Sequence, residues 1–143
     1  MPHHHQHLCS IMLIVGVHHG RRHHHRYEIF LTANRRSHLA NVIVTVGHKV
    51  SFTLVFLDQN GNPMLTTPTP DAAPTWSDTT PATGTLTAAP SGLTAVEIAN
   101  AVGSDTVNVA LSVGGTAFTA SIDLTVQEAP QVLTSLQILA TVA

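Results

Sequence analysis

The sequence has little cysteine, little charge and no long apolar run. Cys9 is its only cysteine, so no disulfide can form within the chain. Charged residues make up 10% of the 143 residues, whereas an average domain has about 25%. The apolar segment Leu8–Val17 is only about half the roughly 20 residues that a membrane-spanning helix needs. We therefore expect a fold held by packing alone, with no membrane segment.

A signal peptide is not expected either. Such a peptide has a basic start and a cleavage site of small residues, but here histidines precede the apolar segment and Val17-His18-His19 follow it. Cys9 does not lie behind a lipoprotein-type motif.

Positive charge almost disappears after the first quarter of the chain. Beyond Ser37 the only Lys or Arg is Lys49, opposed by Asp58, Asp71, Asp78, Glu97, Asp105, Asp123 and Glu128. This part of the chain is mildly acidic and has no basic surface for nucleic acid. It also contains 18 threonines, whose β-branch suits a strand and whose hydroxyl keeps an outward face soluble. Two interpretations of the many threonines stay open: they form a neutral, displayed surface, or they reflect only the strand propensity of threonine.

Residues 1–40 differ in composition, and we expect them to form an irregular arm. The arm is rich in arginine and histidine, with His3, His4, His5, His7, His18, His19, His23, His24 and His25. Histidine tracts are a compositional pointer to metal. A specific site needs ligands held by a scaffold, and neighbouring histidines in a floppy arm would chelate only loosely. We therefore predict no metal site and no cofactor.

The arm also permits a mis-assigned gene start. Arg35-Arg36 can be encoded AGG-AGN, which is a ribosome-binding sequence, and Leu39 can be a TTG or CTG start codon. Under this hypothesis the mature protein begins at Leu39, which would explain why the arm shares no composition with the rest of the chain.

From residue 41 to residue 128 the sequence alternates between apolar and polar residues. This period of two is typical of strands with one face on a core. The predicted strands are Val42–Gly47, Val50–Leu57, Thr75–Ser77, Thr83–Ala88, Leu93–Ile98, Val107–Val113 and Phe118–Val126. A shift in apolar parity between Leu93 and Val96 predicts a bulge. Gly114-Gly115 predicts a two-residue hairpin turn, and the prolines of Thr66–Pro74 predict an edge or loop.

Short strands at this spacing, without a helical pattern, predict an all-β sandwich of about seven strands. The inward-facing parity predicts a core of Val44, Val46, Phe52, Leu54, Phe56, Trp76, Val107, Val109, Leu111, Phe118, Ile122 and Leu124. Residues 129–143 form a C-terminal tail that is again strand-like, with Leu133, Leu136, Ile138 and Val142 as its interface candidates. Such an apolar tail is expected to be buried against the sandwich or, as we favour, against another chain.

Several motifs together resemble a known family. Phe52-Thr53-Leu54, the turn Asp58–Pro63, Thr75-Trp76-Ser77, Gly103–Val109 and Ile122–Val126 follow one another as in bacterial immunoglobulin-like domains of group 2, the invasin/intimin-like kind. The resemblance covers about Val42 to Gln127 and departs from the family at Gly92–Val102. It implies an immunoglobulin-like fold and a non-enzymatic display or adhesion module, of the single-copy kind found in tailed-bacteriophage structural proteins.

No residue set for catalysis is visible in the sandwich. His48 and Ser104-Asp105 are predicted to be turn residues, and Trp76 a core residue rather than a platform for sugar. Asp58, Asn60 and Asn62 have the alternate spacing of a calcium loop but lack its glutamate, so we predict a turn closed by Asx hydrogen bonds.

The chain is therefore predicted not to be an enzyme. The favoured function is a bacteriophage virion surface protein, such as a capsid decoration protein, that attaches through its flanking segments. Its partners would be other virion proteins or copies of itself, without nucleic acid or membrane, in a homo- or hetero-oligomeric assembly. The alternative is a secreted or surface-attached bacterial adhesion module.

Overall fold

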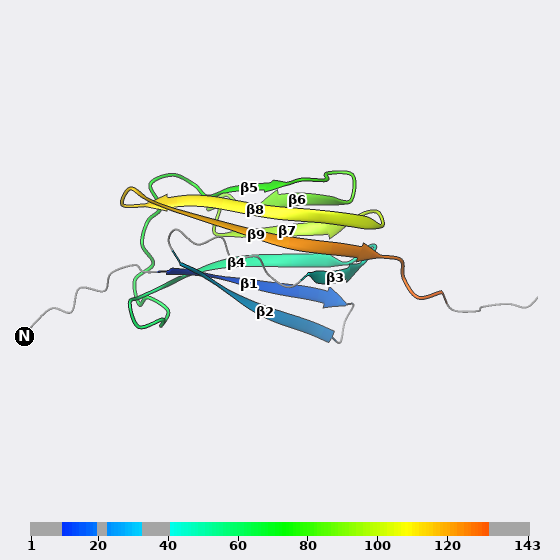
Figure 1. The fold of residues 1–143 in the computed structure, drawn as a ribbon, viewed down its shortest axis with the longest axis horizontal. Coiled ribbons are helices and arrows are strands. Elements are labelled where there is room, and N and C mark those ends of the chain that lie inside the picture. The colour runs from blue at the N-terminus through cyan, green and yellow to red at the C-terminus, as the bar shows by residue number, and fades with distance from the viewer. Residues whose placement is uncertain (1–9, 20–22, 33–40, 132–143) are drawn as a thin grey trace, which may run out of the picture.

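The computed structural model describes residues 10–19, 23–32 and 41–131, which form nine β-strands (Figure 1). No helix in this part of the chain could cross a membrane. The strands are β1 (Ser10–His19), β2 (His23–Thr32), β3 (Val42–Thr45), β4 (Lys49–Leu57), β5 (Thr75–Asp78), β6 (Gly84–Ala88), β7 (Thr94–Ala99), β8 (Gly103–Val113) and β9 (Thr116–Gln127).

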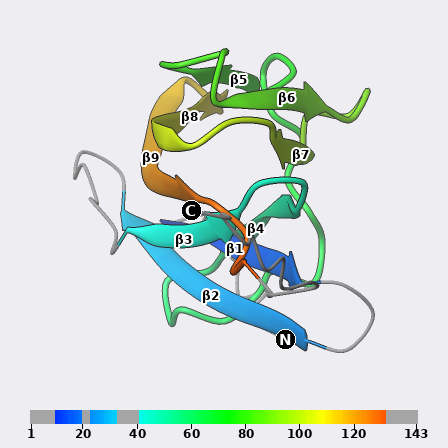
Figure 2. The same ribbon diagram turned by 90° about the vertical axis from the view of Figure 1, so that its right-hand side faces the viewer.

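The nine strands make two sheets packed face to face. One sheet has the order β2-β1-β4-β7-β6 and the other the order β3-β9-β8-β5, with β3 parallel to β9 and the other pairs antiparallel. The edge strands β5 and β6 lie together at one side of the sandwich, and β2 lies at the opposite side (Figures 1 and 2). The orders β1-β4-β7-β6 and β5-β8-β9 are those of strands ABED and CFG of an immunoglobulin domain. The predicted immunoglobulin-like sandwich is confirmed.

The prediction of an irregular N-terminal arm is wrong for both described segments before residue 41. β1 pairs with β4 along nearly its whole length, from Ser10 opposite Leu57 to His18 opposite Lys49. Its inward side chains are fully buried, and they are Ile11, Leu13, Val15 and Val17. The segment forms a strand because its apolar residues alternate with a period of two, as they do in β4. β1 thereby occupies the place of strand A and completes the core.

The strand count changes accordingly. Seven strands lie between Val42 and Gln127, as predicted, and β1 and β2 bring the described total to nine. β2 pairs with the outer edge of β1, from Thr32 opposite Ser10 to His23 opposite His19. The predicted strand-like tail after Gln131 lies outside the described residues.

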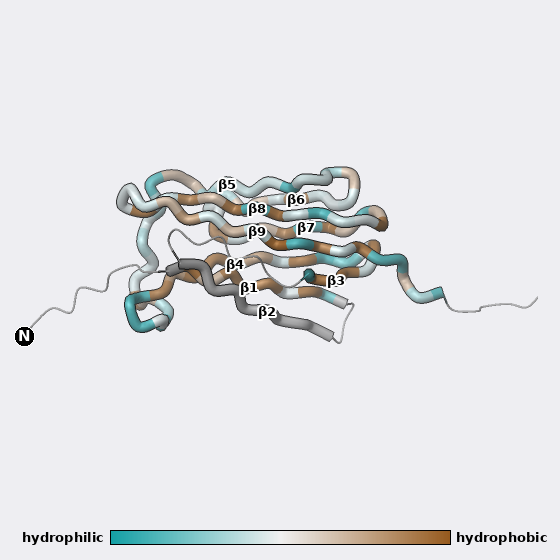
Figure 3. Tube along the Cα trace, viewed as in Figure 1, coloured by the Kyte–Doolittle hydropathy of each residue, from teal (hydrophilic) through white to brown (hydrophobic). Residues whose placement is uncertain are grey.

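The core prediction is confirmed. Apolar and polar residues alternate along the central strands (Figure 3), and every predicted core residue except Val46 and Trp76 is buried. Val46 and Trp76 are half-buried and pack against the core. The Trp76 ring lies 5.7 Å from the Phe52 ring between centroids, and its Nε1 donates to the Gly92 carbonyl at 2.7 Å. Trp76 is thus a core residue, as predicted.

The predicted turns are also present. Gly114 and Gly115 join β8 to β9 with φ of 56° and 77°, the left-handed region that favours glycine. Asp58 Oδ1 accepts from the backbone N–H of Asn60 at 2.8 Å and of Asn62 at 3.0 Å. This is the predicted Asx turn, since the carboxylate is used by its own backbone.

The predicted bulge in β7 is wrong. β7 pairs without interruption with β4 on one side and with β6 on the other. Ala95, Glu97 and Ala99 face the core, whereas Val96 and Ile98 face outward and are partly exposed. The two large apolar side chains of this segment, Val96 and Ile98, therefore point away from the core, and a carboxylate takes a core position.

Candidate functional site

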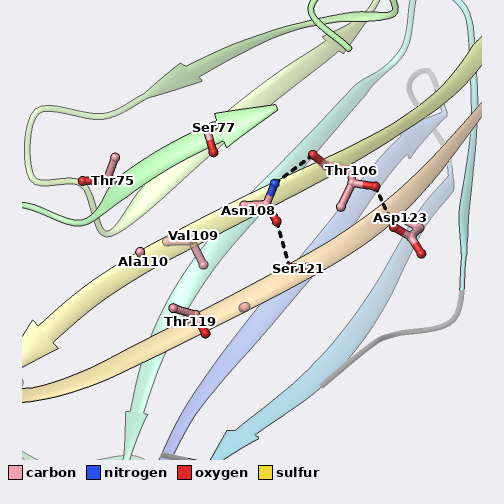
Figure 4. Close-up of a pocket in the computed structure, with 10 residues that line it drawn as sticks. Thr75, Ser77, Thr106, Asn108, Val109, Ala110, Thr119, Ser121 and Asp123 are labelled. Atoms are coloured by element: carbon pink, nitrogen blue, oxygen red, sulfur yellow. Dashed lines mark hydrogen bonds between the residues drawn. The ribbon is translucent and has the colours of Figure 1, made fainter. Parts of the chain in front are cut away.

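The sheet β3-β9-β8-β5 carries a groove of about 450 Å³ on its outer face (Figure 4). Its lining comes from β5, β8 and β9. The residues are Thr75, Ser77, Thr106, Asn108, Val109, Ala110, Thr119, Ala120, Ser121 and Asp123.

The strand register places the polar side chains of this groove in rows. One row crosses three strands with Ser77, Asn108 and Ser121, because Asn108 lies opposite both other residues. The next row has Thr75, Ala110 and Thr119. The intervening residues of β8 turn into the core, so these side chains must face solvent. Small side chains in both rows leave the surface hollow.

Hydrogen bonds order one end of the groove. Thr106 Oγ1 donates to Asp123 Oδ1 at 2.8 Å, and Ser121 Oγ donates to Asn108 Oδ1 at 2.8 Å. Asn108 Nδ2 donates to the Thr106 carbonyl at 3.3 Å. Asp123 is the only ionisable residue of the lining. The groove thus offers hydroxyl and amide groups for hydrogen bonds to a neutral or weakly polar partner. Of the two hydroxyl groups that donate within the lining, Ser121 donates to an amide oxygen and Thr106 to a carboxylate oxygen.

The predicted interface residues Leu133, Leu136, Ile138 and Val142 lie outside the described residues. Their role as an attachment surface stays a prediction.

Ser104-Asp105 is not a turn, so that prediction is wrong. Both residues belong to β8, and Asp105 faces the core with 3% of its surface exposed. Asp105 Oδ1 accepts from the Thr79 N–H and hydroxyl at 3.0 Å, from the Thr80 N–H at 2.8 Å and from the Thr106 N–H at 2.7 Å. The side chain therefore fastens the chain after β5 to the start of β8.

His48 lies in the turn between β3 and β4, as predicted, and its N–H donates to the Thr45 carbonyl at 3.0 Å. The side chains of the histidine clusters are mostly outside the described set; His18 Nε2 lies 3.2 Å from Ser51 Oγ. Among the side chains that the structure describes, no three His, Cys, Asp or Glu residues come close enough to hold a metal ion.

A second carboxylate fastens the long loop between β4 and β5. Asp71 accepts from the N–H of Gly114 and of Gly115, each at 2.9 Å, through its two oxygens. These hydrogen bonds, led by the one from Gly115, lower the pKa of Asp71 below its ordinary value of 3.8. The loop is thereby attached to the β8–β9 hairpin, next to the groove.

Sequence reasoning missed one buried group altogether. Glu97 is 1% exposed, and neither of its carboxylate oxygens has a hydrogen-bond partner. Burial, together with the negative charges of Asp105 and Asp78, raises the pKa of Glu97 from 4.5 to about 7. No signal in the sequence points to it, because Val96 and Ile98 on either side favour the opposite phase, with Glu97 outward.

No family model and no curated protein matches the chain. Solved structures of an S-layer protein, SbsC, have a backbone fold similar to that of this chain. A crystal structure of its domains 4 and 5 is 17% identical, with a TM-score of 0.42, and the match covers 71% of this chain and 59% of that one. A structure of its domains 4–9 is 18% identical, with a TM-score of 0.49 and coverage of 85% and 18%.

A crystal structure of rSbsC(31–844) is also 18% identical, with a TM-score of 0.41 and coverage of 82% and 17%. The chain therefore spans 59% of the first of these structures and less than a fifth of the other two. Likenesses of this size do not carry a function from those proteins to this chain.

Proposed function

We propose that this chain is a non-enzymatic display module that binds a neighbouring protein or surface component at the exterior of a bacterial cell. The observation that carries the proposal is the outer face of the sheet β3-β9-β8-β5. This face presents a groove of hydroxyl and amide groups on a rigid sandwich with a filled core. Such a surface suits recognition through hydrogen bonds and shape, because the groove has few charged groups that must lose their hydration when a partner binds.

Two features support the exterior setting. The surface beyond Ser37 is rich in threonine and poor in charge, as expected for a β domain that is exposed rather than surrounded by nucleic acid. The resemblance to bacterial immunoglobulin-like domains of group 2 points to the same class of adhesion and display modules. That resemblance stays a prediction.

A bacteriophage virion is the second candidate setting. The alternating apolar residues Leu136, Ile138 and Val142 favour assembly with many copies or with other virion proteins, as for a capsid decoration protein. Gold-labelled antibodies on intact cells and on purified phage particles would distinguish a cell-surface protein from a virion protein.

A groove variant tests the proposed mode of binding. Thr119 is exposed at the groove, and Thr119→Arg would place a long cation across it. We expect retention of the purified chain on its cells or particles to fall at least about tenfold, the effect of losing roughly 1.4 kcal/mol of binding free energy. A pull-down with quantified bound protein measures this.

The matched control for the groove is Thr87→Arg, because Thr87 is exposed on β6 of the other sheet. Both variants are expected to keep the wild-type melting temperature. Equal retention of the Thr119→Arg variant and the wild type would contradict attachment through the groove.

Deletion of Gln131–Ala143 tests the tail separately. β9 ends at Gln127, so the sandwich is expected to stay folded without these residues. If the tail is the attachment segment, the truncated chain will no longer co-purify with particles or subunits. Full occupancy by the truncated chain would exclude the tail, and unfolding of the truncated chain would show that the tail belongs to the sandwich.

A further inference from the structure

Glu97 holds a position in the core that an aliphatic residue would normally take. It lies on the central part of β7, opposite Val50 of β4 and Leu86 of β6, and it faces between the sheets. Its carboxylate also needs the glycine at position 84. A Cβ on Gly84 would clash with Glu97 Oε1, so the missing side chain provides the space that the carboxylate fills.

This space contains no donor for the carboxylate. Neither Glu97 oxygen accepts a hydrogen bond, and Asp105 Oδ2, which is also buried, accepts none. The titratable groups that face Glu97 are Asp105 from β8 and Asp78 from β5, while β4 and β6 contribute Val50, Leu86 and Gly84. An ionised Glu97 would therefore be a buried charge that faces two like charges, which is among the most costly arrangements inside a protein.

The strand that covers this carboxylate is held on one side only. β6 is the edge strand of its sheet and pairs with β7 alone. β5, the edge strand of the other sheet, lies next to it, and the chain between them is fastened by Asp105. Separating β6 from β7 would expose the carboxylate without breaking any other ladder.

We propose that Glu97 is a proton-operated latch, which holds β6 on the sandwich when neutral and releases it when ionised. Burial and the charges of Asp105 and Asp78 raise the pKa of Glu97 from 4.5 to about 7 in the folded chain. The folded state therefore binds this proton more tightly than an opened state does. Closure is favoured most below pH 4.5, weakens as pH rises through this interval, and reaches its minimum above about pH 7.

Hydrogen exchange of the full chain tests the latch. Protection of the amides in Gly84–Ala88, corrected for the intrinsic exchange rate, is expected to fall on the order of a hundredfold between about pH 4.5 and about pH 8.5. Glu97→Gln removes the ionisation and should abolish this fall, whereas Glu128→Gln, at an exposed position, should keep it. β9 should show no comparable change in the wild type.

The same pH-dependent fall in the Glu97→Gln variant would overturn the proposal. If that variant does not fold, the wild type decides by a carbon-13 NMR titration of the Glu97 carboxyl. A midpoint near pH 7 supports the latch, and a midpoint at its ordinary value of 4.5 overturns it.

Discussion

Removing residues 1–38 is expected to leave a chain that no longer folds as a stable monomer. The deletion takes away β1 and β2, and with β1 the four fully buried side chains Ile11, Leu13, Val15 and Val17. Burial of four such aliphatic side chains contributes on the order of 6–12 kcal/mol. That is comparable to the whole stability of a typical domain, about 5–15 kcal/mol. It would also leave β4 with one unpaired edge, which is a template for association.

Urea unfolding and size-exclusion chromatography of the two chains measure this effect. A chain that begins at Leu39 and is as stable and monomeric as the full chain would contradict the place of β1 in the core and strengthen the gene-start hypothesis. Mass spectrometry of native protein decides the start itself, since peptides between His3 and Arg26 exist only if translation begins upstream.

Two neighbouring substitutions are the matched controls for the deletion. Leu13 faces the core and Ile14 faces outward and is half-buried, so both carry a similar side chain on the same strand. Leu13→Asn should destabilise the fold far more than Ile14→Asn. Similar effects of the two substitutions would show that β1 does not pack with this parity.

Phe52→Ala is expected to lower the free energy of unfolding by about 3–5 kcal/mol. Phe52 is fully buried at the centre of β4, between β1 and β7, and its ring contacts Trp76 from the opposite sheet. The substitution leaves a cavity at the point where both sheets meet, where neighbours on paired strands have little freedom to close it. Chemical unfolding monitored by Trp76 fluorescence reports the loss.

Thr53→Ala is the control for Phe52→Ala, because Thr53 is the next residue of β4 and faces outward. Its effect should stay within about 0.5 kcal/mol. A Phe52→Ala variant as stable as the wild type would contradict the assignment of the core.

Most of the strands from β3 to β9 could be predicted because they have a clear period of two and are bounded by turn residues. β1 has the same period, with Ile11, Leu13, Val15 and Val17 on one face. Its apolar run is too short for a membrane helix, and the histidines around it give it the composition of an arm. The histidine-rich composition around β1 therefore led to the prediction of an arm, although the alternation of its apolar residues is typical of a strand.

The candidate groove could not be predicted from the sequence. Its rows join Ser77, Asn108 and Ser121, which are far apart along the chain, and only the register of β5, β8 and β9 brings them together. Period-two alternation says which residues share a face of one strand. It does not say which strands are neighbours.

The amino-acid pattern alone is enough for the all-β class, the seven strands after Val42, much of the core on β3, β4, β8 and β9, and the turns at Asp58–Pro63 and Gly114-Gly115. Only the pairing of strands in the folded chain shows that β1 completes the sheet and that β7 turns Glu97 inward, with Val96 and Ile98 outward. The physical reason is that either of the two alternating sets of side chains on an isolated strand could face the core. On β7, pairing with β4 and β6 decides which set faces inward. Backbone hydrogen bonds hold the register of both pairs along their length.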